Sequence, residues 1–535
     1  MQADLLLLNG RVYTMDADCP TAQAIAIAGS RILAVGEDAD LRQFLRPGGQ
    51  AVDVRGRAII PGLIDAHVHF GWYSIAIYQH QVDLDNVPTK AEAVARAAEA
   101  ARQTPPGRWI QGGGWNKNIW PGLAFPTAAD LDAAIPGHPV ALEDKSRHAT
   151  WVNSPALERA GITLDTEDPP GGQILRDESG KPTGILLETA AGLVHEIIPE
   201  PDVETMADAL RQGMAQAHRL GLTGFQDPGH HTVLAALQVL RARGELALRA
   251  LVHIPSDELE SAVELGVRSA FGDEFLRIGG VKIFADGALG PQSAHMLSPY
   301  EGTTSELGVP SHTAAGLYDL VHRAHQAGLS VAVHAIGDAA NRVVLDAIEH
   351  AQAVGSSTPP SLPNRIEHVQ LLHPEDLPRL ARLDVIASMQ PIHATSDMEM
   401  AERHWGRRCD LAYAWRSVLD SGARLAFGSD CPVEVLDPLA GIHAAVTRRR
   451  ADGSPGPAGW IPAQRLTVAQ AVHAYTLGAA YASGEAHLKG ALAPGRVADL
   501  VVLSRDIFAI DPMEILDARV EMTVLGGQIV YRNKI

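Results

Sequence analysis

The sequence predicts an α/β protein whose main domain is a closed, TIM-like (β/α)8 barrel. Three observations predict this fold class. Short apolar runs alternate with helical stretches through the middle of the chain, both chain ends are rich in short strands, and a long segment interrupts the pattern after the first barrel strand. Strands that alternate with helices are typical of a parallel β/α array. In a chain of 535 residues, a closed barrel is favoured over an open sheet.

Both ends of the chain have the pattern of short β-strands. Residues 4–14 hold two apolar runs around the turn signal Asn9-Gly10, and residues 24–35 repeat the pattern. Residues 498–503 and 520–531 have the same character. Neither end has enough strands to bury a face. Residues 1–58 and 490–535 are therefore predicted to form one composite β-sandwich domain.

The middle of the chain, residues 59–489, is predicted to form the barrel domain. Its strand candidates are residues 58–64, 222–226, 248–254, 280–285, 330–335, 365–369, 385–389 and 424–428. Helical patterns lie between most of them, at residues 91–102, 203–220, 316–327, 341–354 and 374–383. No GxGxxG or Walker loop opens a helix, which argues against a nucleotide-binding fold.

The interval between the first and second barrel strands is much longer than one crossover helix. Within it, residues 109–115, 140–149 and 171–176 have strand patterns broken by Gly, Pro and Asn. Long connections in compact domains are usually functional. We interpret residues from about 75 to 200 as an insertion after barrel strand 1 that covers the mouth of the barrel.

The composition predicts a cytoplasmic protein that acts on a small molecule. The net charge is −19, from 63 acidic and 44 basic residues, so neither nucleic acid nor an anionic membrane is an expected partner. The three cysteines, Cys19, Cys409 and Cys431, are odd in number and far apart, which favours a reducing compartment. The sequence has no signal-peptide pattern and no membrane-spanning apolar run. Assembly into a homo-oligomer stays open.

Metal-competent side chains lie where five of the barrel strands end. They are His67 and His69 after strand one, Lys282 in strand four, His334 in strand five, His368 in strand six and Asp430 after strand eight. Two histidines at i and i+2 on an extended segment point to the same side. Singly, each residue has a structural alternative: a core histidine, a turn or helix-capping aspartate, or a lysine that needs a partner. Because the strand ends converge in a barrel, their combination predicts one metal site.

The same motifs resemble those of the amidohydrolase superfamily. Residues 60–69 (IPGLIDAHVH) match its first-strand signature, and residues 490–503 (GALAPGRVADLVVL) match its terminal sandwich. Residues 281–287 (VKIFADG), residues 334–338 (HAIGD) and the long first insertion resemble the YtcJ-like branch, which includes N-substituted formamide deformylase.

The resemblance implies a hydrolase acting on carbon–nitrogen bonds other than peptide bonds. Its metal ligands would be His67, His69, Lys282, His334, His368 and Asp430, around one or two divalent ions, with Zn²⁺ suited to the imidazoles. A metal-bound hydroxide would attack an amide or formamide carbon, and Asp430 would pass the water's proton to the leaving amine. Lys282 is either carboxylated and bridging two ions or unmodified beside one. We favour the carboxylated, dinuclear form.

Three alternatives were weighed against the amide hydrolase. Deaminases of the superfamily lack the strand-four lysine and carry a glutamate three residues after the fifth-strand histidine, where this chain has Gly337. An ester or carbamate hydrolase would use the same metal chemistry. A non-catalytic scaffold relative typically loses metal ligands, whereas this chain keeps every one.

A substrate pocket is predicted less directly. Residues 112–116 (GGGWN) and 148–154 (HATWVNS) resemble segments that line the pocket in the YtcJ-like branch. The resemblance implies that Trp115 would stack on a substrate and that His148 would hold its carbonyl oxygen. Asp338, four residues after His334, would orient a metal ligand. Core, turn and helix-capping roles are the alternatives for these residues. The histidines interpreted as structural or surface residues are His230, His231, His393, His404 and His443.

Overall fold

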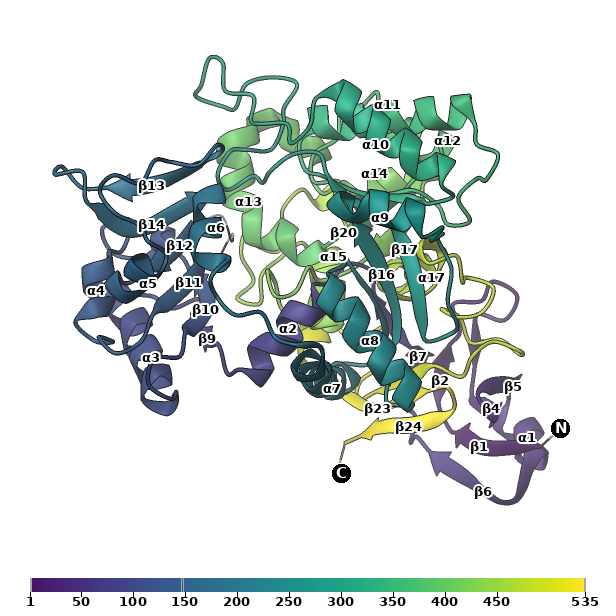
Figure 1. Cartoon of the computed structure of the whole chain (residues 1–535). Helices are drawn as coiled ribbons and strands as arrows, with labels where there is room; N and C mark the ends of the chain where they lie inside the picture. The colour runs from purple at the N-terminus through teal and green to yellow at the C-terminus, as the bar shows by residue number, and fades with distance from the viewer. Residues whose placement is uncertain (1, 146, 148, 534–535) are drawn as a thin grey trace. The chain divides into compact units, whose positions relative to one another are not determined.

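The computed structural model describes residues 2–145, 147 and 149–533, and its largest sheet has eight parallel strands (Figure 1). The strand order is β21-β20-β19-β18-β17-β16-β15-β8, so neighbours in the sheet follow one another along the chain. The strands are β8 (Leu63–Asp65), β15 (Leu222–Asp227), β16 (Arg249–Pro255), β17 (Leu276–Phe284), β18 (Val331–Ala335), β19 (Arg365–His368), β20 (Ile386–Met389) and β21 (Leu425–Phe427). The predicted α/β fold class is confirmed.

The eight-stranded sheet is nearly closed into a barrel between β21 and β8. The backbone N–H of Ala66 donates to the carbonyl oxygen of Phe427, with N and O 3.0 Å apart. The buried carboxylate of Asp65 accepts from the hydroxyl of Ser429 at 2.6 Å and from its backbone N–H at 3.0 Å. These bonds join the ends of the strands that precede the HxH motif and Asp430.

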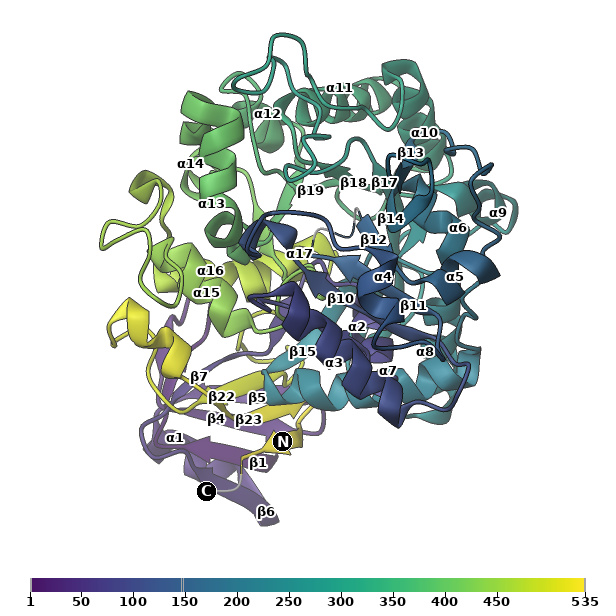
Figure 2. The same cartoon turned by 90° about the vertical axis from the view of Figure 1, so that its left-hand side faces the viewer.

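Helices follow most barrel strands and lie outside them (Figure 2). They are α7 (Val203–Arg219), α8 (His231–Arg243), α9 (Leu259–Glu264), α10 (Ala314–Gln326), α11 (Asp338–Val354), α12 (Leu377–Arg382), α13 (Pro391–Trp405), α14 (Trp415–Asp420), α15 (Pro438–Thr447), α16 (Val468–His473) and α17 (Ala479–Ala482). In α10, the side chain of Thr313 caps the first turn, and Leu317, Val321 and Ala324 form one buried stripe. Spacings of three and four residues give such an amphipathic helix its inner face.

The prediction that residues 58–64 form one barrel strand is wrong. The segment divides at Gly62 into β7 (Ala58–Pro61) and β8. β7 pairs with β2 and β22 outside the barrel, whereas β8 pairs with β15. A Cβ atom at Gly62 would lie 2.3 Å from the Oγ1 atom of Thr223, so the change of sheet requires glycine there.

Strands from both ends of the chain share a six-stranded sheet of order β24-β23-β22-β7-β2-β3. A four-stranded sheet, β5-β4-β1-β6, packs against it through a common apolar core that includes Leu5, Ile25, Ile59, Leu500 and Val524. The remaining strands are β1 (Ala3–Leu8), β2 (Arg11–Tyr13), β3 (Thr21–Ala22), β4 (Ala24–Ala28), β5 (Arg31–Gly36), β6 (Leu45–Asp53), β22 (Leu500–Leu503), β23 (Val520–Leu525) and β24 (Gln528–Arg532), and helix α1 spans Asp38–Leu41. The domain limits at residues 58 and 490 stay a prediction.

Asp499, in the C-terminal motif, ties this terminal sheet to the barrel. Its carboxylate accepts from the Nε and Nη2 atoms of Arg249, at the start of β16, at 2.6 and 3.0 Å. Both side chains are buried, and the backbone N–H of Gly526 donates to the same carboxylate. A buried ion pair is tolerated only when its polar atoms are satisfied in this way, which gives the motif a structural reason.

Residues Trp72–Ala209 form a second compact unit with its own six-stranded sheet, of order β13-β14-β12-β11-β10-β9. Its strands are β9 (Val82–Asp83), β10 (Ile110–Trp115), β11 (Val140–Asp144), β12 (Ala149–Val152), β13 (Gly172–Arg176) and β14 (Pro182–Glu188), with helices α2 (Phe70–Tyr78), α3 (Lys90–Gln103), α4 (Ala128–Asp132), α5 (Ser154–Arg159) and α6 (Gly192–His195). The single strand predicted at residues 140–149 is instead the antiparallel pair β11 and β12, in which Leu142 faces Trp151.

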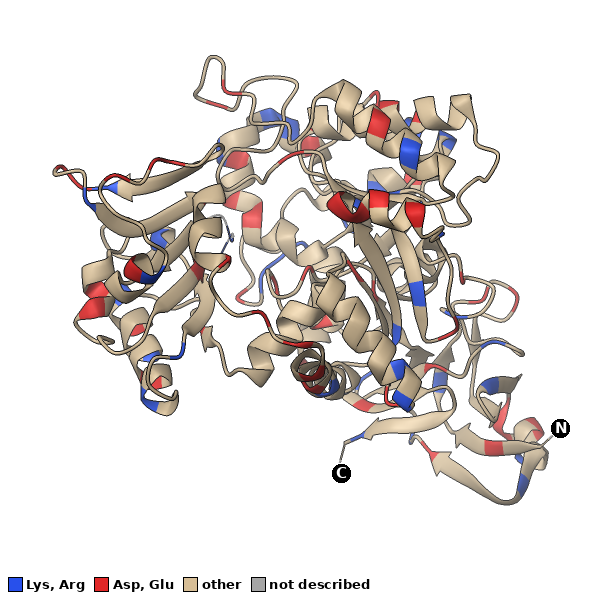
Figure 3. Cartoon of the chain, in the orientation of Figure 1, with Lys and Arg blue, Asp and Glu red and all other residues tan. Residues whose placement is uncertain are grey.

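Charged residues of both signs are interspersed along the helices and strands in Figure 3. Among the described residues, no helix combines the length and the apolar character needed to cross a bilayer.

Candidate metal centre

The barrel brings the side chains predicted as metal ligands together at the C-terminal ends of its strands. The imidazole ring centroids of His67 and His368 lie 5.0 Å apart, those of His334 and His368 lie 4.5 Å apart, and those of His67 and His69 lie 5.7 Å apart. Lys282 lies in β17, between the strands that lead to these histidines, and is buried. Five strands therefore supply one cluster.

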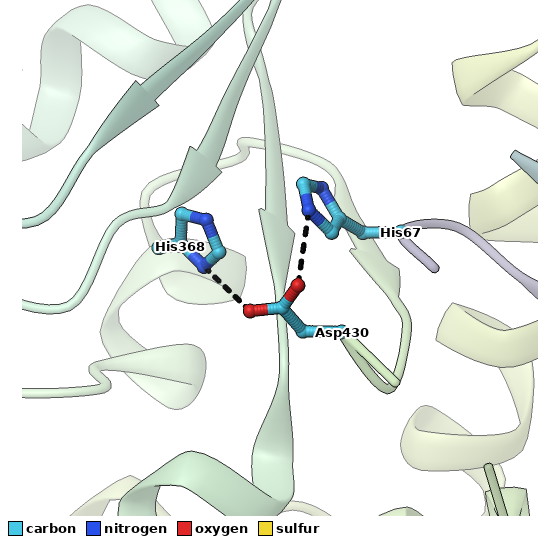
Figure 4. Close-up of side chains that lie close together, drawn as sticks. All are labelled: His67, His368 and Asp430. Carbon is cyan, nitrogen blue, oxygen red and sulfur yellow. Dashed lines mark ion pairs between the residues drawn. The ribbon is translucent and has the colours of Figure 1, made fainter. Parts of the chain in front are cut away.

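Asp430 lies between His67 and His368 (Figure 4). Its Oδ1 atom is 3.4 Å from Nε2 of His67 and 3.3 Å from Nε2 of His69. Its Oδ2 atom is 4.0 Å from Nδ1 of His368. One ligand atom from each of His67, His368 and Asp430 lies within 4.8 Å of the other two, a spacing that one metal ion can occupy.

Unusual backbone conformations aim two of these side chains inward. The φ angles of His368 and Asp430 are 76° and 59°, in the left-handed region that non-glycine residues rarely adopt. Strict alternation along β19 would turn Glu367 into the barrel and His368 out of it. The positive φ at the strand end brings both inward. Such conformations cost about 1–3 kcal/mol each and cluster at functional sites.

Each of three histidines uses one ring nitrogen to contact an oxygen acceptor. Nδ1 of His67 lies 2.7 Å from Oε2 of Glu367, and Nδ1 of His368 lies 2.9 Å from Oε1 of Gln390. Nε2 of His334 lies 3.0 Å from the carbonyl oxygen of Gly287. When these nitrogens donate, the other nitrogen of each ring keeps its lone pair. Metal-ligating histidines are held in this way, so the donor set fits a metal ion.

Glu367, which contacts His67, is held in its ionised form. Arg365, fully buried inside the barrel, bonds with the side chains of Glu367, Gln226 and Ser388 and with the carbonyl oxygen of Ala66. Burial opposes the charge on Glu367, but Arg365 and then His67 hold the pKa of this carboxyl well below its usual value. The carboxylate therefore stays available to accept from His67.

The protonation states of three of the four candidate histidines also suit a metal site. Burial, reinforced by Lys282, lowers the pKa of His334 to about 3, and burial lowers the pKa values of His69 and His368 as well. These rings are neutral at physiological pH, which is the form that binds metal. Burial also lowers the pKa of the Lys282 ammonium to about 8, although Glu367 and Asp430 favour its charge.

His393, interpreted from the sequence as structural or surface, is part of the cluster. Its Nε2 atom lies 3.2 Å from Oδ2 of Asp430, and its Nδ1 atom lies 3.7 Å from Oε1 of Glu434. Burial opposes its charge, but these two carboxylates raise the pKa of His393 to about 10. The strand-end pattern does not indicate His393, because this residue lies in the first turn of α13, beyond the end of β20.

Asp338 and Trp115 have structural roles: Asp338 caps a helix, and Trp115 is a core residue. Asp338 begins α11, and its Oδ1 atom accepts from the backbone N–H groups of Ala339 and Leu297. Asp286 lies nearer to His334, with Oδ1 3.6 Å from its Nε2 atom. Trp115 is 1% exposed, which leaves no open ring face for a substrate. The third predicted pocket residue, His148, lies outside the described residues.

Replacing Trp115 by alanine is expected to destabilise the unit Trp72–Ala209 rather than to change substrate preference. The indole packs on Trp120, Trp151 and Phe125, and its N–H donates to the carbonyl oxygen of Leu142. Loss of a buried tryptophan costs about 3–5 kcal/mol. Denaturant unfolding followed by circular dichroism measures the loss. If the Trp115→Ala variant kept its stability but had a changed KM, the prediction that Trp115 stacks on the substrate would be supported instead.

Comparisons with known proteins place the chain among amidohydrolases and metal-dependent hydrolases. The model of the Amidohydrolase family matches residues 50–531. The putative amidohydrolase YtcJ of Bacillus subtilis is 34% identical over 98% of this chain and 98% of its own length. N-substituted formamide deformylase of Arthrobacter pascens is 31% identical over 99% of this chain and 98% of its own. A solved structure, an uncharacterized metal-dependent hydrolase from Pyrococcus horikoshii, has 27% identity and a TM-score of 0.79, covering 95% of this chain and 99% of that one.

Proposed function

Because the chain belongs to the amidohydrolase family, as its motifs predicted, we propose that it hydrolyses a carbon–nitrogen bond of the amide or formamide type. The observation that carries this proposal is the cluster of His67, His69, His334, His368, Lys282 and Asp430. Three of its histidines, His67, His334 and His368, already contact an oxygen acceptor through one ring nitrogen. Membership of this family implies a divalent metal ion. We propose zinc, because neutral imidazoles dominate the donor set.

The bound metal would lower the pKa of a water molecule towards ~7 and polarise the scissile carbonyl group. The histidines and Asp430 would hold the metal ion. The carboxylate of Asp430 would accept the water's proton and deliver it to the leaving amine. His393 fixes Oδ2 of Asp430, so that Oδ1 faces His67 and His69. The products are a carboxylate and an amine, or formate and an amine from a formamide.

Two residues, Lys282 and Gly337, favour amide hydrolysis over deamination as the proposed reaction. Lys282 is present in β17, and position 337, where the deaminases carry a glutamate, is a glycine whose N–H donates to Asp286. A Cβ atom at Gly337 would lie 1.9 Å from the carbonyl oxygen of His295, so no larger side chain fits. The formamide class is favoured by the name of the Arthrobacter pascens relative.

A hydrolysis screen tests this proposal. The zinc-loaded protein is incubated with formamides, acyl amides, carbamates and esters, and with aminoheterocycles as deaminase substrates, and released amine, alcohol or ammonia is measured. We expect turnover of formamides or amides, abolished by Asp430→Asn. Ammonia release from the aminoheterocycles alone would instead support a deaminase, and turnover confined to carbamates or esters would replace the proposed bond class.

His393 is expected to act through Asp430. His393→Ala should lower kcat by roughly 10–100-fold, the usual effect of removing a group that orients a metal ligand. His393→Gln should retain more activity, because its amide N–H can still donate to Oδ2. Kinetics and the zinc-to-protein ratio are measured for both variants, with His404→Ala, on the same helix, as the control. Equal loss in the Ala and Gln variants would contradict this positioning role.

A further inference from the structure

Phe284 is a large apolar side chain on the inner face of the barrel, at the edge of the polar cluster. It follows Lys282 by two residues in β17, so both side chains point to the same face, while Ile283 between them is fully buried on the other. The Nζ atom of Lys282 lies 4.7 Å from the centroid of the Phe284 ring. The ring of Phe284 is 5.1 Å from that of His334.

The exposure of the side chains shows which side of the cluster is open within the barrel unit. The side chains of His67 and His368 are 3% and 5% exposed, whereas those of His334 and His69 are 12% and 18% exposed. Phe284 is 48% exposed, the highest value among these residues. A reactant that reaches the cluster beside His334 therefore meets the free face of the Phe284 ring.

We propose that Phe284 is a specificity-determining residue that binds a hydrocarbon substituent of the substrate, on the nitrogen of a formamide or amide. This inference rests on the proposed function and narrows its substrate class. The open ring face next to a metal-ligand histidine gains free energy only when an apolar group covers it. A wholly polar substrate of the same size would leave that face against water.

The first experiment compares substrates of increasing chain length. Values of kcat/KM are measured for N-methyl-, N-butyl- and N-hexylformamide with the wild-type protein and with Phe284→Ala and Phe284→Leu. In the wild type, kcat/KM should rise with chain length. Phe284→Ala should lose ~10–100-fold on the hexyl compound and much less on the methyl compound. Phe284→Leu should retain part of the preference. Phe271→Ala, which removes a 74% exposed phenylalanine before the start of β17, is the matched control.

The second experiment measures binding without turnover, so that the inference and the proposed function fail separately. Calorimetric titration of the zinc-loaded Asp430→Asn protein, with and without Phe284→Ala, uses the same three formamides. Tighter binding of the longer chains, lost with Phe284→Ala at unchanged zinc content, supports the inference. It does so even when the wild type hydrolyses neither formamides nor amides, a result that would overturn only the proposed function. Binding independent of chain length, or a preference that survives Phe284→Ala, would overturn the inference.

Discussion

Substitution of Asp430 by asparagine is expected to lower kcat by at least ~10²-fold, the effect of removing a general acid or base, while the metal stays bound. Asparagine has the shape of aspartate, so its side-chain oxygen can still face His67 and His69. Its amide cannot accept a proton from water. Burial opposes the charge of Asp430, but the contacts with His393, His67 and His69 hold its pKa well below the usual value, so the carboxylate is ionised.

Steady-state kinetics on the best substrate of the screen measure kcat, and zinc analysis measures the bound metal. Asp420→Asn changes an exposed carboxylate on α14 and should leave both quantities unchanged. Near-normal turnover of Asp430→Asn would refute the proton-transfer role. Loss of zinc with the loss of turnover would show that Asp430 acts chiefly as a ligand.

The fold could be predicted because most barrel strands are short apolar runs followed by a helix. The predicted and observed strands differ by a few residues at most, except where residues 58–64 divide between two sheets. That division depends on the contact of Gly62 with Thr223, a residue that is distant in sequence and invisible to local patterns. The division of residues 140–149 into β11 and β12 was also missed, although the polar residues 143–148 separate the two apolar runs.

The candidate ligands could be predicted because they lie at strand ends, where the barrel imposes convergence. What surrounds them could not. Glu367 adjoins His368 in the sequence, but alternation alone would place only one of the two inside, and the positive φ of His368 is set by the folded barrel. His393 reaches Asp430 from a helix, at no fixed spacing from a strand. Such contacts depend on tertiary structure, so the periodic pattern of apolar residues in the sequence does not reveal them.

Lys282 is the proposed ligand whose chemical state would matter most for the proposed reaction. The carboxylated form needs a neutral amine that can react with CO₂, and burial lowers the pKa of Lys282 to about 8, which makes that form accessible near neutral pH. Among the described residues, no carboxylate forms an ion pair with its Nζ atom, which instead lies over the Phe284 ring. Lys489 is the contrasting case: it is equally buried, but Nζ lies 2.6 Å from Oε2 of Glu485.

Lys282→Ala is therefore expected to lose both metal and activity, with partial rescue by short carboxylic acids such as formate or acetate. A carbamate would supply a negative charge and two oxygens to metal ions that His67, His69, His334 and His368 would hold. A small carboxylate can occupy the same space once the lysine is gone. Lys489→Ala should weaken folding, as removal of one partner from a buried pair does, but the folded fraction should keep its metal and show no rescue.

Two measurements decide between the carboxylated and the unmodified lysine. Zinc analysis should give two ions per chain when the protein is prepared with bicarbonate, and about one or fewer for Lys282→Ala. A crystal grown with bicarbonate should show a planar group beyond Nζ of Lys282, which an unmodified ammonium lacks. Rescue should also require a carboxylate group, which could bridge two ions. A neutral amide of the same size, such as acetamide, should not rescue, because it carries no charge to replace the carbamate. An unmodified Lys282 beside one fully occupied metal ion, in an enzyme with full activity, would show that the dinuclear form is wrong and that this lysine acts as a hydrogen-bond donor to Asp430 or to the substrate.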